Sequence, residues 1–131
     1  MSERSEKARS LFLDDGFHCS QAVLGVFPEY IDSDTALKIT SCFGGGMRKG
    51  EVCGAVTGAL MILGIVYGYS DKNDLDNKRL SNKIASDFMD AFKAKFNSYL
   101  CKEIIGARNI CANYVAWAVE AAEEIIEKFK G

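Results

Sequence analysis

The chain has 131 residues, a length that suits one domain with one hydrophobic core. Hydrophobic residues make up 48% of it and charged residues 26%, with one proline, and this composition excludes a disordered chain. The net charge of -2 and the scattered lysines and arginines argue against nucleic acid as a partner. We therefore expect a single folded domain over residues 1–131.

The N-terminal segment "MSERSEKARSLF" carries charges of both signs and has no apolar run after a basic start. It therefore predicts no signal peptide, and we expect a cytoplasmic location. Cytosolic thiols are kept reduced, and disulfide frameworks belong mainly to small secreted domains. The five cysteines of the chain therefore call for a role other than a disulfide framework.

Apolar residues recur with a helical period along the whole chain, and no segment alternates as a strand would. The sequence therefore predicts an all-α fold. Its first three helices are expected over residues 2–15, 19–27 and 35–43. Gly16 ends the first because glycine tolerates the left-handed conformation, and Pro28 ends the second.

The run from Val52 to Tyr69 contains no charged residue. It reaches the lower limit of the roughly 17–25 residues that span a bilayer. Four glycines, a threonine and a cysteine dilute its hydrophobicity, however, and the chain has no second run of this kind. An apolar helix lined with small residues is also typical of the centre of a soluble bundle. We therefore expect a buried helix and no membrane span.

A long helix is predicted from Asn73 or Asp74 onward, because apolar residues recur in it at every fourth position. This stripe is expected to belong to the core and consists of Leu80, Ile84, Phe88, Phe92 and Phe96. One or two helical turns follow over residues 98–106, and Asn109 is expected to cap the last helix. The predicted architecture is a bundle of about six helical segments around a buried, glycine-rich central helix.

The five cysteines are too far apart for a C-x-x-C or zinc-finger pattern. Cys19, Cys53, Cys101 and Cys111 each lie at or next to a predicted helix start, whereas Cys42 lies at a helix end. The N–H groups at a helix start favour the thiolate, which is both a nucleophile and a metal ligand. A single cysteine is more often a small core residue. Five cysteines in 131 residues, with repeated placement at helix starts, are more than packing requires, so for the set we favour a chemical role.

Two further features lie close to these cysteines in the sequence. His18 precedes Cys19 and is a candidate ligand, a base for the thiol, or a solvent-facing residue. The run Gly44, Gly45 and Gly46 could bind an anion with backbone N–H groups, but the P-loop pattern is absent. The favoured interpretation is a tight bend between Cys42 and Cys53.

The segments around the cysteines resemble one known family. They are "HCSQAVLGVF", "FGGGMRKGEVCGAVTGALMILG", "CKEIIG" and "ICANYV", and the second contains the core C-G-A-x-x-G. The chain resembles the redox-active proteins named C_GCAxxG_C_C after their cysteine pattern. The resemblance implies that Cys19, Cys53, Cys101 and Cys111 are the family's cysteine set and that Cys42 is an extra thiol. The sequence is also similar to part of the split-Soret cytochromes, whose cysteines are associated with an iron–sulfur centre.

Three hypotheses follow for the function. The first is an iron–sulfur cluster or a zinc ion bound by the four cysteines, with Gly44, Gly45, Gly46, Gly54 and Gly58 shaping the cofactor's surroundings. The second is metal-free thiol–disulfide exchange, with Cys53 and Cys19 as catalytic thiols. The third is a helical interaction module with structural cysteines. Haem attachment is not expected, because C-x-x-C-H is absent. We expect a redox partner, which the sequence does not identify. The sequence also leaves homo-oligomerisation open.

Overall fold

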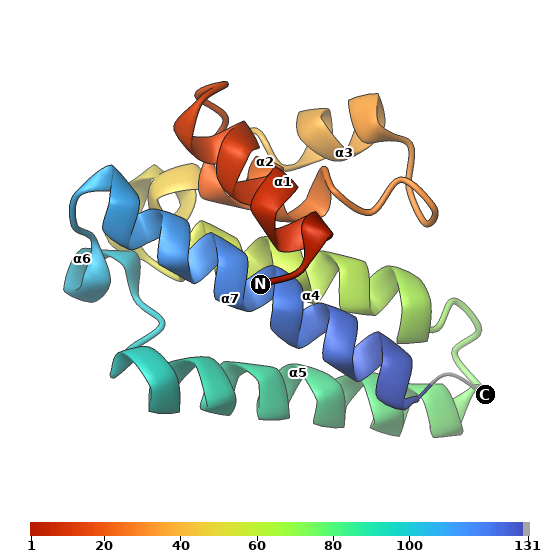
Figure 1. Cartoon of the computed structure of the whole chain (residues 1–131). Coiled ribbons are helices and arrows are strands. Elements are labelled where there is room, and N and C mark those ends of the chain that lie inside the picture. The colour runs from red at the N-terminus through yellow and green to blue at the C-terminus, as the bar shows by residue number, and fades with distance from the viewer. Residues whose placement is uncertain (130–131) are drawn as a thin grey trace.

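The computed structural model describes residues 1–129, and within this range every regular element is helical (Figure 1). The all-α prediction is confirmed. The elements are α1 (Glu3–Leu13), α2 (Cys19–Leu24), α3 (Ser33–Ile39), η1 (Gly46–Gly50), α4 (Gly54–Tyr67), α5 (Leu75–Phe96), α6 (Cys101–Ile104) and α7 (Arg108–Lys128). The described part of the chain thus has eight helical elements, and the predicted number of about six was too low.

The differences from the predicted boundaries have local causes. Helix α2 ends at Leu24 instead of residue 27, with Gly25 as its C-terminal cap. The predicted loop 44–50 contains η1, a short π-type turn. Helix α7 begins one residue before the predicted cap Asn109, because the carbonyl of Ala107 already accepts the N–H groups of Ile110 and Cys111.

The helices form three layers (Figure 1). Helices α4 and α7 contact one another and lie between α5 on one side and α1 and α2 on the other. Helix α3 packs on α2, outside this arrangement. Helix α6 and η1 contact each other at one end of the molecule, beside the starts of α2, α4 and α7. That end therefore contains the glycine run and most of the cysteines discussed in the sequence analysis.

Helix α4 is buried over its first half and reaches the surface in its second. Gly54 and Gly58 lie buried against α2, whereas Gly64 and Ile65 are exposed. Ile62 and Leu63 remain buried in this second half, so the expectation of a buried helix holds for one face of it and not for the exposed face. None of the helices in the described part is long and apolar enough to cross a membrane.

The apolar stripe of α5 packs into the core as predicted. Phe88 and Phe92 are fully buried, and Phe96 meets Tyr114 and Trp117 of α7 edge to face. Such tilted aromatic pairs add roughly 0.5–1.5 kcal/mol each to the burial of their rings. The stripe thus anchors α5 to α7.

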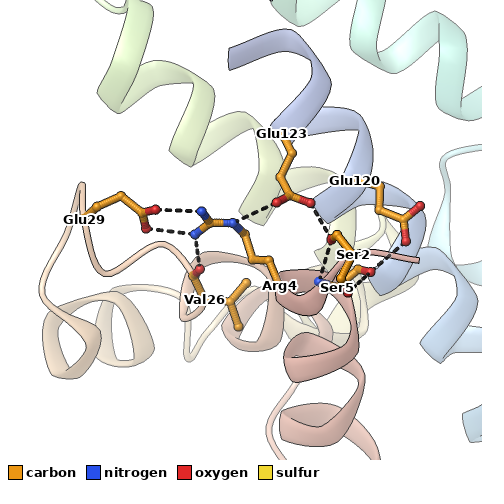
Figure 2. Close-up of polar contacts among 7 residues, drawn as sticks. All are labelled: Ser2, Arg4, Ser5, Val26, Glu29, Glu120 and Glu123. Carbon is orange, nitrogen blue, oxygen red and sulfur yellow. Dashed lines mark hydrogen bonds and ion pairs between the residues drawn. The ribbon is translucent and has the colours of Figure 1, made fainter. Parts of the chain in front are cut away.

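A polar network fixes the start of α1 on α7 (Figure 2). The Arg4 guanidinium donates to Glu123 on α7, and to Glu29 and the Val26 carbonyl in the segment after α2. It also lies over the Phe27 ring, 4.4 Å from the centroid. The Arg4 side chain is only 24% exposed, so these charge-assisted bonds are partly shielded from water.

Candidate thiol site

Four of the five cysteines line one cavity of about 240 Å³ at the end of the molecule where α6 and η1 lie. They are Cys19, Cys53, Cys101 and Cys111, and they come from the starts of α2, α4, α6 and α7. The fifth, Cys42, is exposed in the turn after α3 and does not line the cavity. The predicted bend therefore does not place Cys42 in this cavity with Cys53.

A pair of backbone hydrogen bonds brings Cys53 and Cys101 together. The Cys53 N–H donates to the Tyr99 carbonyl at 2.7 Å, and the Cys101 N–H donates to the Glu51 carbonyl at 2.6 Å. These bonds flank the isolated antiparallel bridge between Val52 and Leu100. Because side chains alternate along extended backbone, Cys53 and Cys101 are diagonal neighbours on one face of this bridge.

Two glycines allow α2 to approach the start of α4. A Cβ added at Gly54 would lie 3.3 Å from the Cys19 Cβ and 3.1 Å from the Ser20 nitrogen. One at Gly58 would lie 2.9 Å from the Ser20 carbonyl oxygen. Any larger residue here would push α2 away from α4. Gly54 and Gly58 therefore set the approach of Cys19 to Cys53.

The glycine run packs against two other parts of the site. A Cβ at Gly44 would lie 2.5 Å from the His18 ring, and a Cβ at Gly46 would lie 2.9 Å from the Cys101 Cβ. Gly45 lines the cavity itself, as does Gly54. Of the five glycines expected around the cofactor, only these two line the cavity, while Gly44, Gly46 and Gly58 support its walls.

The segment between Gly45 and Arg48 adopts a left-handed turn that the sequence did not predict. Four successive residues have positive φ, and two of them, Met47 (φ 58°) and Arg48 (φ 64°), are not glycine. The left-handed conformation costs a non-glycine residue roughly 1–2 kcal/mol. The surrounding packing must offset this cost. Gly46 shows how close the packing is, since a Cβ there would lie 2.5 Å from the Glu51 nitrogen, 2.6 Å from the Glu51 carbonyl oxygen and 2.9 Å from the Cys101 Cβ.

Burial outweighs the helix starts in setting the thiol pKa values. Desolvation raises the pKa of Cys53 to about 11, although the amides of Ala55 and Val56 act in the opposite direction. The pKa values of Cys19 and Cys101 are also raised, first by burial and then by the other thiolates. The expectation that helix starts would lower the pKa is therefore wrong for these three cysteines.

The remaining lining residues run from a buried floor to an exposed rim. Phe12, Cys53, Gly54 and Tyr114 are buried, and the Tyr114 hydroxyl donates to the Ile104 carbonyl at 2.7 Å. His18, Ile105, Gly106 and Arg108 are exposed at the rim. Arg108 and Tyr114 were not among the predicted site residues. Their spacing from Cys111, three residues on either side, is the helical spacing that could have indicated them.

The donor set suits a thiolate-ligated metal, because four cysteines are the usual ligands of zinc and of iron–sulfur clusters. Across residues 1–129, however, no three His, Cys, Asp or Glu side chains are already arranged as metal ligands. The four cysteines thus line one cavity without forming a coordination sphere there.

A comparison with protein families gives a match over most of the chain. The family described as "Putative redox-active protein (C_GCAxxG_C_C)" matches residues 17–125. The chain belongs to this family. A search of curated proteins and a search of solved structures each found no match. All four cysteines that line the cavity lie within the matched range, and the family is described as redox-active.

Proposed function

We propose that the protein is an electron-transfer protein whose Cys19, Cys53, Cys101 and Cys111 bind an iron–sulfur cluster. One observation carries the proposal: four cysteines from four different helix starts line a single cavity. Cysteines used only as small core residues would be spread through the bundle. Zinc bound by the same four thiolates is the alternative cofactor.

A bound cluster would supply a one-electron redox centre. The chain's own residues would hold it at a fixed place, since hydrogen bonds at the Val52–Leu100 bridge and the close packing at Gly54 and Gly46 position three of the four cysteines. The backbone amides of Ala55 and Val56 face the Cys53 sulfur and would offset negative charge there. Phe12 and Tyr114 would exclude water from the floor of the site.

The proposal has consequences for the chain as a whole. Residues 1–131 would act as one cytoplasmic electron-carrying domain that receives electrons from one redox partner and passes them to another. The site opens at the rim around Ile105, which is 63% exposed, and this opening would bring the centre close to a docked partner. No nucleic-acid partner is expected.

The test is an anaerobic purification without a metal-binding tag. One sample is assayed for its visible spectrum, iron, zinc, acid-labile sulfide and free thiols. Iron and sulfide in near-stoichiometric amounts, retained by Cys42→Ser and lost in Cys53→Ser and Cys111→Ser, would support the cluster. Zinc with the same dependence would replace it as the cofactor.

A colourless, metal-free protein would contradict the proposal. The free-thiol count then decides between the other two hypotheses. Fewer than five free thiols that return on reduction would indicate disulfide exchange, whereas five free thiols would favour structural cysteines in an interaction module.

A further inference from the structure

The rim of the cavity holds a fixed positive charge. Arg108 is the first residue of α7, and its guanidinium lies over the Phe12 ring, 4.2 Å from the centroid. The same side chain donates a hydrogen bond to the Phe12 carbonyl. These two contacts restrict a side chain that would otherwise move freely at the surface.

Within residues 1–129, the lining of the cavity provides no acidic side chain to balance this charge. Among the residues described, neither aspartate nor glutamate lines the cavity, and His18 is the other basic side chain there. The ion pairs found within residues 1–129 do not involve Arg108 either. The guanidinium therefore keeps donor groups available to something that enters the cavity.

The size and lining of the cavity limit what could enter. At about 240 Å³ it lies below the roughly 300–1,000 Å³ of sites for drug-sized ligands, so a flavin or a nucleotide would not fit. Apolar side chains cover the rest of the wall, with Phe12, Ile104 and Ile105 among them. The guanidinium is a planar fork that matches the two oxygens of an oxyanion.

We propose that the cavity binds a small oxyanion, either a carboxylate or an inorganic oxyanion, through Arg108. This inference goes beyond the proposed function, because it assigns an anion to Arg108 at the rim of the cavity, beside the four cysteines that a cluster would use. The binding itself requires only Arg108 and the cavity, so it is testable without a bound metal.

Cys111 is a suitable reporter, since it lines the cavity three residues after Arg108 on the same helix. Side chains at this spacing have Cβ atoms about 5–6 Å apart. Cys42, exposed and outside the cavity, is an internal reference in the same molecule.

The experiment compares alkylation by anionic iodoacetate and neutral iodoacetamide in the full-length, reduced and chelator-treated protein at low ionic strength. Mass spectrometry gives the rate for each cysteine, and circular dichroism confirms that the helices are retained. The ratio of the two rates cancels differences in thiol accessibility and thiolate fraction.

The ratio at Cys111 should fall at least about three-fold in Arg108→Gln, the factor for unit charges about 6 Å apart in water-like surroundings. It should be largely retained in Arg108→Lys, and unchanged in Arg79→Gln, the same change on the exposed surface of α5. The ratio at Cys42 should not respond to any of these variants. An equal ratio at Cys111 in wild type and Arg108→Gln would overturn the proposal.

Competition identifies the class of oxyanion. Acetate and inorganic phosphate are each tested for whether they slow the alkylation of Cys111 by iodoacetamide. Chloride is used to match the ionic strength. Protection by acetate that is lost in Arg108→Gln supports a carboxylate ligand, and protection by phosphate supports an inorganic oxyanion. Protection by neither would overturn a bound oxyanion, and neither result depends on whether the anaerobic protein contains iron.

Discussion

Replacing Gly58 by alanine should destabilise the protein, although alanine is the better helix former. The new Cβ would lie 2.9 Å from the Ser20 carbonyl oxygen and 3.1 Å from the Val23 Cβ. Both neighbours belong to α2, and the carbonyl oxygen is backbone, so relief requires α2 to move. Overpacking of this kind costs about 1–3 kcal/mol, against a gain of up to about 1 kcal/mol in helix propensity. With the full gain subtracted, we expect a net loss of up to about 2 kcal/mol.

Gly64→Ala is the matched control on the same helix. A Cβ at Gly64 would have no neighbour within 4 Å among residues 1–129, so the variant should gain about 0.5–1 kcal/mol. Urea unfolding followed by circular dichroism measures both variants. With a slope near 2 kcal/mol per molar urea, their midpoints should differ by about 1 M. If Gly58→Ala unfolds at or above the midpoint of Gly64→Ala, the packing argument for α2 and α4 is wrong.

Three further predictions concern polar and thiol groups. Arg4→Gln should cost about 1–2 kcal/mol in urea unfolding, because it removes partly buried charge-assisted bonds, whereas Lys38→Gln, in an exposed pair, should change stability by under about 0.5 kcal/mol. The Arg4 hydrogen bond holds the pKa of Glu29 at about 2, below its ordinary 4.5, so this stabilisation should be complete above pH 4.5 and fall toward pH 2. Since Glu29 is 48% exposed, the free energy of unfolding should fall by less than about 1 kcal/mol over this pH range, and this loss should vanish in Arg4→Gln. An equal pH dependence of stability in both proteins would contradict the prediction. In metal-free protein a thiol reagent should modify exposed Cys42 well before Cys53, which is 4% exposed; equal rates would show that the cavity opens freely.

The helical elements could be predicted because their signals are local. The spacing of Phe88, Phe92 and Phe96 defines one face of a helix whatever it packs against, and the structure places this face in the core. The left-handed turn could not be predicted in the same way. Met47 and Arg48 are not residue types that favour positive φ, and the turn depends instead on the close packing around it, where a Cβ at Gly46 would meet the Glu51 backbone and the Cys101 Cβ.

The same distinction between local signals and tertiary packing applies to the candidate site. The sequence by itself determined that four cysteines lie at or near helix starts, because caps and helical periods depend on residues within a turn or two. Only the tertiary structure decided that these starts meet at one cavity, that Cys42 is left outside, and that Arg108 lies at the rim. It also reversed the expected direction of the thiol pKa shifts. Desolvation depends on what covers a sulfur, and the covering residues come from helices far apart in the chain.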